Sequence, residues 1–170
     1  FRRFQMGTEY GLKQTWPDKV TDTSTSAVNG LGVLRFEGNK TYVYVLCQGG
    51  AAVLGDSLTV ASTADGVVTM DRNGGGTLAF CVRGVAIGAI ASGSYGWIQK
   101  QGICVVQCDG GVAAADPLIP CVNTSSDGHA DTAVAASDAA NTEYKVFGFA
   151  LTADAGSADG DTCTAYINCK

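Results

Sequence analysis

Short apolar stretches separated by turn residues run along most of the chain. Leu31–Phe36 and Thr41–Cys47 flank a Gly-Asn dipeptide, which predicts a β-hairpin. In the second stretch valine and cysteine alternate with tyrosine and leucine, so one face of the strand points to a core. Long leucine-rich amphipathic runs are missing, and the one Ala-rich stretch, His129–Tyr144, fits a helix and a loop with a short strand equally well. We therefore predict an all-β fold, a small β-barrel or sandwich.

The chain contains a weak internal repeat. Thr41–Ala52 aligns with Gly102–Ala113 at a constant offset of 61 residues, with cysteine and a Gly-Gly doublet in matching places. Each half then ends in a return strand, YGWIQ at Tyr95–Gln99 and TAYIN at Thr164–Asn168. We predict a body built from two related halves. Two further motifs recur in the same order: Asp56–Leu58 with Asp116–Leu118, and Gly84–Ile87 with Gly148–Leu151.

The beginning of the chain differs from the rest. Residues 1–29 show no strand alternation and contain Trp16-Pro17 followed by the polar run Thr21–Ser26. Proline pushes the residue before it towards an extended backbone, and a run of Ser and Thr is typical of a linker. We predict an extended N-terminal arm and linker at residues 1–29 and one β-rich domain at residues 30–170.

The stretch Tyr95–Gln99 places one of the two tryptophans in a predicted strand. Alternation puts Tyr95, Trp97 and Gln99 on one face of that strand. Aromatic residues at this spacing either stabilise a sheet face in the core or become buried between subunits. Both interpretations remain open from the sequence, and these three residues are our candidates for a subunit interface.

Charge is distributed unevenly. Residues 1–19 carry four basic and two acidic residues, a net charge of +2, and the remainder carries 7 basic and 14 acidic residues, a net charge of −7. An acidic body argues against nucleic-acid binding, because contact with phosphates needs a basic surface. A basic, aromatic segment on an acidic body indicates a tether that docks on another surface, with a frayed terminus as the alternative. The chain has no apolar run of about 18 residues, so we expect no membrane span.

Residues that carry chemistry are few. The single histidine, His129, follows a turn and has only Asp131 close by in the sequence. The Gly-rich stretch Asp71–Leu78 lacks the Lys-Ser/Thr pair of a phosphate-binding loop, and the acidic run Asp154–Asp161 lacks the spacing of an EF-hand. We predict no catalytic site, no metal site and no cofactor, and we expect a protein that occupies a surface rather than an enzyme.

Seven cysteines make an odd number in a chain that is long enough to fold without disulfides. Cys104 and Cys108, and Cys163 and Cys169, are separated by even intervals, so each pair lies on one face of a strand. Buried free thiols that act as small apolar side chains are our first interpretation. A disulfide that locks the domain is the second, and a metal site is the third.

The second half combines several motifs: GVAIGAIASGSYGWIQKQGICVVQCDGGVAAADPLIP, then HADTAV, then VFGFALTADAG. This combination resembles the small β-rich head decoration, or capsid cement, proteins of tailed bacteriophages. Those proteins show a Tyr-Gly-Trp-Val-Gln strand, then Gly-Asp-Pro-Leu-Val-Pro and a later Gly-x-Ala-Leu. With the first-half segment TYVYVLCQGGAAVLGDSLTVAS, the likeness covers roughly Leu31–Ile167. The chain departs from the pattern in its seven cysteines and in Ala115, which stands where glycine is usual before Asp-Pro.

The resemblance implies a viral structural protein without an active site. Such proteins sit on the outer surface of an icosahedral head, often as trimers, and clamp neighbouring major capsid subunits together. We expect the same partners here, the major capsid protein and two further copies of this chain, in the virion. The arm would drape over the capsid and add a strand to an exposed sheet edge. Its candidate contacts are four apolar anchors, Phe1, Phe4, Tyr10 and Trp16, and three charge partners, Arg2, Arg3 and Lys13.

Three other functions fit parts of the sequence. A glycan-binding head-fibre or adhesin-type domain would use the face of Trp97 as an exposed platform for stacking and hydrogen bonding. A small hydrolase would use Asp127, His129 and Asp131. A major capsid subunit is disfavoured, because this mostly β chain lacks the long helix expected of a tailed-phage shell protein.

Overall fold

The structure is a computed structural model that describes residues 16, 18–61, 66–70, 81–121, 127–133, 146–154, 156 and 158–169. Within these residues the chain forms strands and no helix, so none could serve as a membrane-spanning helix. The strands are β1 (Thr23–Ser24), β2 (Leu34–Glu37), β3 (Lys40–Cys47), β4 (Ser57–Val60), β5 (Val67–Thr69), β6 (Val82–Ala86), β7 (Tyr95–Cys108), β8 (Pro117–Pro120), β9 (Ala130–Thr132), β10 (Gly148–Ala150) and β11 (Asp161–Asn168).

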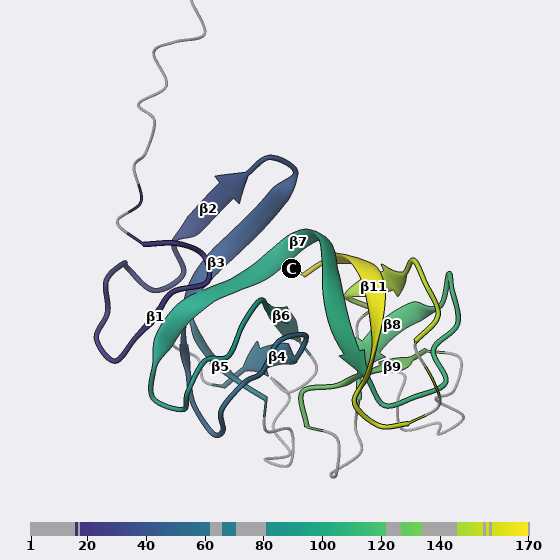
Figure 1. Cartoon of the computed structure of the whole chain (residues 1–170). Helices are drawn as coiled ribbons and strands as arrows, with labels where there is room; N and C mark the ends of the chain where they lie inside the picture. The colour runs from purple at the N-terminus through teal and green to yellow at the C-terminus, as the bar shows by residue number, and fades with distance from the viewer. Residues whose placement is uncertain are drawn as a thin grey trace, which may run out of the picture.

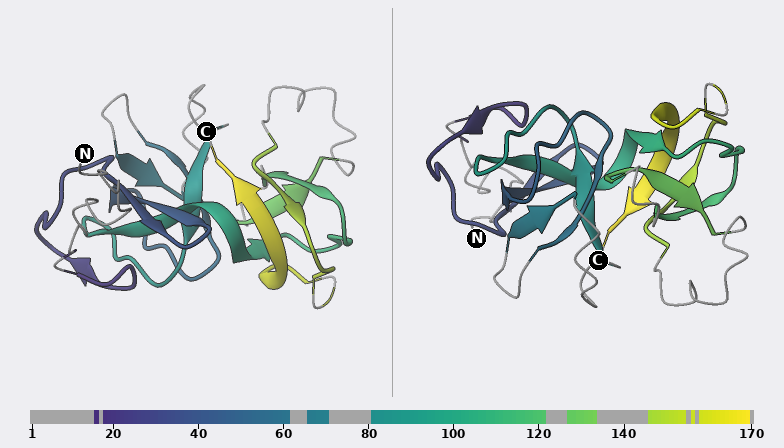
Figure 2. Two further views of the ribbon diagram at one scale, coloured as in Figure 1. Left: turned by 90° about the horizontal axis from the view of Figure 1, so that it is seen from above. Right: turned by 90° about the horizontal axis from the view of Figure 1, so that it is seen from below.

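The long strand β7 is shared by two closed rings of strands (Figure 1). Its first half pairs with β3 and β6, and β4 and β5 complete the first ring, in the order β3-β5-β4-β6-β7. Its second half pairs with β9 and β11, and β8 and β10 complete the second ring, in the order β7-β9-β8-β10-β11. The rings lie side by side, with β1 and β2 outside them (Figure 2). The prediction of a small all-β barrel made of two halves is confirmed.

The two rings repeat the same pairings in the same order. β3 runs parallel to β5 with Cys47 opposite Val68, and β7 runs parallel to β9 with Cys108 opposite Ala130. Cys47 and Cys108 are 61 residues apart, the offset that the sequence repeat predicts. Within each ring the remaining neighbours are antiparallel. The internal repeat is therefore a repeat of topology.

The return strands of the two rings, the first part of β7 and the strand β11, are equivalent in the structure. Their residues align differently from the alignment of YGWIQ with TAYIN that the sequence suggests. Gln99 pairs with Val85 in the first ring, and Tyr166 pairs with Phe149 in the second. Gln99 therefore corresponds to Tyr166, so the stretch TAYIN stands two residues out of step with YGWIQ. Side chains alternate with a period of two along a strand, so this shift keeps every residue on its face and the sequence pattern did not reveal it.

The repeated Asp-x-Leu motif builds the same turn in both rings. The Asp56 carboxylate accepts a hydrogen bond from the backbone N–H three residues earlier at 2.7 Å, and the Asp116 carboxylate does so at 2.9 Å. The residue before each aspartate has a left-handed backbone, with a φ of 94° at Gly55 and 76° at Ala115. Among the described residues Ala115 is the one non-glycine residue with a positive φ, a backbone conformation that glycine adopts more readily.

One apolar core lies within the first ring, and a second is formed mainly by the second ring and extends to Val82 and Val85 on β6. The second core contains four thiols, Cys104, Cys108, Cys163 and Cys169, and the Cys108 thiol donates a hydrogen bond to Cys163 Sγ at 3.4 Å. Burial raises the pKa of Cys104 and of Cys169 to about 12. All seven cysteines are free; five of them are buried, as the first of the three interpretations expects, and Cys81 and Cys104 are half-buried. The first core consists of Val43, Val45, Cys47, Ala52, Leu58, Val68, Ala86, Ile90 and Ile98.

Residues 16 and 18–29, which we assigned to the arm and linker, lie against the first ring. β1 adds to β7 with Thr23 opposite Gly96. The Val28 N–H donates a hydrogen bond to the hydroxyl of Tyr44 at 3.1 Å. A third apolar cluster forms on the outside of the first ring, where this segment helps to cover it: Tyr42, Tyr44 and Trp97, with Trp16, Val20, Val33, Ile87 and Tyr95 packed against them.

Candidate functional site

Trp97 is a core residue of this chain. Its side chain is 1% exposed. The Trp16 ring packs on it edge to face at 5.0 Å between ring centroids, and Tyr44 packs on it at 5.1 Å. The indole N–H donates a hydrogen bond to the Asp18 carboxylate at 2.7 Å, which satisfies its only polar group. Of the two interpretations left open by the sequence, the structure shows the core.

Gln99 is buried as well, and its side chain holds the backbone of β7. Its amide nitrogen donates to the carbonyl oxygens of Gln101 and Ile103 at 3.2 and 3.1 Å, where β7 passes from one ring to the other. Tyr95 is half-buried and stacks on Tyr44 with ring centroids 6.2 Å apart. The predicted interface residues Trp97 and Gln99 therefore face the interior of this chain. The platform proposed for the glycan-binding alternative is not exposed at these positions.

Trp16 is the one predicted arm contact that lies within the described residues. It is half-buried, and the Arg35 guanidinium lies 5.5 Å from its ring centroid and 5.6 Å from that of Trp97. These contacts are made inside the chain, so Trp16 fastens the segment to the first ring. The other six predicted contacts lie outside the described residues: Phe1, Arg2, Arg3, Phe4, Tyr10 and Lys13.

The hairpin of β2 and β3 projects from the first ring (Figure 1). β2 ends the order of strands, and within the described residues it pairs with β3 alone, so its other edge is open. Phe36 and Leu34 on this strand are 70% and 41% exposed. Neither residue was among the predicted site residues, although the hairpin itself was predicted.

The second ring has an apolar outer face, here called the bare face. Tyr166 on β11 lies between Ile103 on β7 and Phe149 on β10 in the strand register, and the three are 42%, 44% and 53% exposed. Val105 on β7 and Leu151, which directly follows β10, extend the face and are 39% and 49% exposed. Neighbouring apolar side chains that stay exposed together mark surfaces for contact with other proteins.

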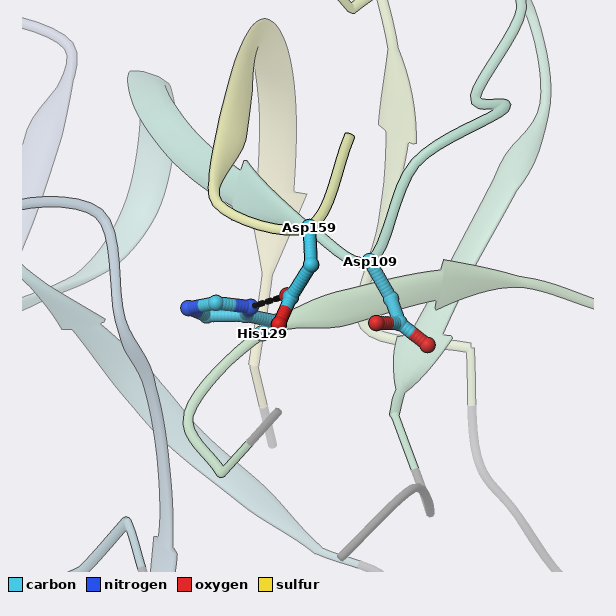
Figure 3. Close-up of side chains that lie close together, drawn as sticks. All are labelled: Asp109, His129 and Asp159. Carbon is cyan, nitrogen blue, oxygen red and sulfur yellow. Dashed lines mark hydrogen bonds and ion pairs between the residues drawn. The ribbon is translucent and has the colours of Figure 1, made fainter. Parts of the chain in front are cut away.

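A polar cluster lies at one end of the second ring. His129 Nδ1 lies 2.5 Å from Asp159 Oδ1, and the Cys121 thiol donates to Asp109 Oδ2 at 3.2 Å. Asp109, His129 and Asp159 bring one ligand atom each to within 4.8 Å of one another (Figure 3), and so do Asp109, Cys121 and Asp131. Burial is the main cause that raises the pKa of Asp131. Imidazole, thiol and carboxylate groups are the donors that zinc prefers, so within the described part of the chain these residues could hold a metal ion.

The polar cluster has no counterpart in the first ring. The Asp109 N–H donates to the Ala130 carbonyl as the Gln48 N–H donates to that of Val68, so Gln48 stands where the second ring has Asp109. In the same way the Ala61 N–H donates to the Val67 carbonyl as the Cys121 N–H donates to that of His129. Ala61 and Val67 therefore stand where the second ring has Cys121 and His129. The fold therefore forms without these polar residues. The sequence did not reveal this cluster because its five members come from four separate segments, and only His129 and Asp131 are close in the sequence.

The similarity of this chain to known proteins is found at the level of structure. No protein-family model and no curated protein matches the sequence. Among solved structures, the chain is similar to the head fiber gp8.5 N base of bacteriophage phi29, with a TM-score of 0.47 and 16% identity over 76% of this chain and 94% of that one. A TM-score below 0.5 at this identity does not establish a shared fold or a shared role.

Proposed function

We propose that this chain is a structural protein of a tailed-bacteriophage head, a decoration protein that binds the outer surface of the capsid and stabilises contacts between major capsid subunits. The resemblance of residues 31–167 to head decoration proteins supports this proposal. The two motifs Asp-x-Leu and Gly-x-Ala, which belong to that resemblance, occupy equivalent places in the two rings. Both motifs form the framework of the domain, so we expect a surface that binds a partner to be formed by other residues.

The observation that carries the proposal is the projecting β2–β3 hairpin. An open strand edge beside exposed apolar side chains can bind another protein by adding a strand and inserting the side chains into its surface. Phe36 and Leu34 stand two residues apart on β2 and therefore point to the same side. Isolated soluble proteins usually protect such an edge, so its exposure favours a partner that covers it.

The base of this hairpin is held in place before any partner binds. Arg35 lies between Leu34 and Phe36 and points to the other face. Its guanidinium donates to the Asp18 carbonyl at 2.7 Å and, through Nε, to the Glu37 carboxylate at 2.8 Å. A preformed hairpin loses little conformational entropy on binding, which favours affinity for a large, repeating surface such as a capsid.

The proposed role needs no cofactor and no catalytic step. Its partners are the major capsid protein and further copies of this chain, and its place is the outer surface of the virion. The acidic body, with a net charge of −7 over residues 20–170, favours protein rather than nucleic-acid partners. Several copies that bind together would gain avidity, so each single contact can be weak.

Sedimentation of native particles through a density gradient tests the proposal. We expect the 17.4 kDa chain to travel with the particles in near-stoichiometric amount. Particles stripped of the protein should bind the recombinant chain, and Phe36→Ser should weaken this binding about tenfold, because an anchor in the centre of an interface contributes more than about 1 kcal/mol. Leu54→Ser is the matched control, since Leu54 is 51% exposed in a loop away from the hairpin. A chain that stays at the top of the gradient would falsify the proposal.

A further inference from the structure

The polar cluster at one end of the second ring contains a set of side chains that suits a metal ion. Asp109, His129 and Asp159 come from three segments of the chain and lie close together (Figure 3). Their ligand atoms lie within 4.8 Å of one another, and His129 Nδ1 lies 2.5 Å from Asp159 Oδ1. Imidazole and carboxylate are both ligands that zinc takes in proteins. The cluster therefore differs from an acidic surface patch, which offers carboxylates alone.

Backbone hydrogen bonds at the ends of three strands position these ligands. The N–H of Asp109, directly after β7, donates to the carbonyl of the first residue of β9 at 2.9 Å. The carbonyl of His129, directly before β9, accepts from the N–H of Cys121 at 2.9 Å. The N–H of Gly160, which follows Asp159 and precedes β11, donates to the carbonyl of the last residue of β7 at 3.0 Å. The ligands are thus attached to a preformed framework, which lowers the cost of gathering them around an ion.

The first ring has the same framework with other side chains. The N–H of Gly93 donates to the carbonyl of the last residue of β3 at 2.7 Å, and φ is 78° at Gly93 and 88° at Gly160. Ser92 precedes Gly93 as Asp159 precedes Gly160. The places of the three ligands are therefore taken in the first ring by Gln48, Val67 and Ser92. The strand ends form there without a histidine and two aspartates, so the fold does not require the polar cluster.

We propose that Asp109, His129 and Asp159 bind one zinc ion and that a water molecule completes its tetrahedral coordination. The side chains of His129 and Asp159 are 15% and 46% exposed, so an ion and a water molecule can reach them. Zinc–ligand distances of about 2.0–2.2 Å put two ligands of a tetrahedral ion roughly 3.3 Å apart. Small side-chain rotations bring atoms that lie within 4.8 Å of one another into this geometry. The two carboxylates neutralise the charge of the ion.

Cys121 supports the site by orienting one of its ligands. Its side chain is 1% exposed, and its thiol donates to Asp109 Oδ2 at 3.2 Å. A carboxylate that binds a metal is commonly held in place by a hydrogen bond from a further group. Cys121 is therefore a positioning residue, although Asp109, Cys121 and Asp131 would also bring three ligand atoms to within 4.8 Å. The thiol and the imidazole predict different spectra for a bound ion, so the two sets of ligands can be distinguished.

The ion joins the ends of β7, β9 and β11. β9 pairs with β7 through one residue pair, Cys108 opposite Ala130, so the second ring closes here with its shortest pairing. The ion holds this closure and has a structural role. The inference goes beyond the proposed function, does not depend on capsid binding and replaces the expectation from the sequence that the chain has no metal site. Its test uses the full chain alone, without particles.

The single histidine of the chain makes a direct test possible. The untagged, ¹⁵N-labelled chain is freed of metal with a chelator and titrated with zinc chloride, and the imidazole nitrogens of His129 are followed by nuclear magnetic resonance. We expect their resonances to shift until one equivalent of zinc is bound and then to stay constant. Isothermal titration calorimetry should give the same stoichiometry. Imidazole resonances that do not change on addition of zinc would overturn the proposal.

Substitutions taken from the first ring remove the ligands and keep the framework. We expect Asp159→Ser and His129→Val each to raise the dissociation constant for zinc at least about tenfold, since loss of a supporting group alone has effects of that size. Asp22→Ser is the matched control, because it removes an exposed aspartate from the segment beside the first ring and should leave zinc binding unchanged. Far-UV circular dichroism verifies that the variants fold. An Asp159→Ser chain that binds zinc as tightly as the wild type would contradict the proposed site.

Cobalt(II) in place of zinc identifies the ligands. We expect the visible absorption of a tetrahedral ion without the near-ultraviolet charge-transfer band of a cobalt–thiolate bond. Cys121→Ala introduces the residue of the first ring, and we expect it to weaken zinc binding about tenfold while the cobalt spectrum keeps its form. A thiolate band would show that the ion is bound through sulfur, and the proposed set of ligands would then be wrong.

Discussion

At the scale of single residues, Ala115 has a backbone conformation that is unfavourable for a residue with a Cβ atom. Its φ of 76° puts an alanine in the left-handed region, which costs about 1–2 kcal/mol for a residue with a Cβ. We expect Ala115→Gly to raise the free energy of unfolding by about 0.5–1 kcal/mol, because relief of this strain exceeds the added entropy of glycine in the unfolded chain. Urea denaturation followed by circular dichroism measures the difference.

Gly55 is the matched control, because it holds the equivalent place in the first ring. A Cβ there would lie 2.9 Å from the backbone nitrogen of Gln107, so Gly55→Ala adds a clash with backbone to the left-handed strain. We expect this variant to lose more than about 1–2 kcal/mol. A loss of stability in Ala115→Gly would contradict our explanation of the turn.

The site at the residue scale was only partly predictable. Trp97 was correctly placed on a strand with Tyr95 and Gln99, because alternation along a strand is local. The burial of the Trp97 side chain could not be predicted from the sequence, because it depends on contacts with Trp16 and with Asp18, which is 79 residues away. The same holds for the pairing of His129 with Asp159, which are 30 residues apart. Contacts between distant segments leave no pattern in a single sequence.

At the scale of elements, the predicted features were those that a short stretch determines. The β2–β3 hairpin follows from a two-residue turn, and the repeat of Asp-x-Leu follows from the same aspartate-capped turn in each ring. The closure of both rings through one strand was not predicted. β7 is 14 residues long and changes partners along its length, which requires the bend that the Gln99 side chain holds.

The thiols between β7 and β11 make the second core sensitive to alkaline pH. Burial raises the pKa of Cys104 and of Cys169 from 9.0 to about 12, so the folded chain keeps protons that the unfolded chain releases. The stability that these thiols contribute is therefore fully present below pH 9 and is lost as the pH rises from about 9 to about 12. Urea denaturation under reducing conditions, at neutral pH and at about pH 11, measures this loss.

The control for the thiols replaces both of them. Cys104→Ala with Cys169→Ala removes two groups that titrate and leaves the tyrosines and lysines in place. We expect this variant to lose less stability between neutral and alkaline pH than the wild type, although it is less stable at neutral pH because of the cavities it leaves. An identical pH dependence in the two chains would show that other groups cause the alkaline loss.

At the scale of the whole molecule, the structure divides the N-terminal region differently from the sequence prediction. The sequence placed one boundary at residue 29, between an arm and a domain. The described residues instead show that the part from Trp16 onward contacts the first ring through Asp18, β1 and Val28. Composition alone did not show this, because a polar run of Ser and Thr is equally compatible with a linker and with an added edge strand. A functional arm is therefore expected before Trp16.

Two truncations separate these roles. Removal of residues 1–15 leaves every described contact in place, so we expect the free energy of unfolding to stay within about 0.5 kcal/mol of the wild type. Removal of residues 1–29 exposes Trp97, deprives its indole N–H of the Asp18 carboxylate and removes β1, and we expect a loss of at least about 3 kcal/mol. Thermal and urea denaturation of both chains measure the difference. Equal stability of the two truncated chains would mean that residues 16–29 do not hold the first ring together, and the boundary at residue 29 would then be restored.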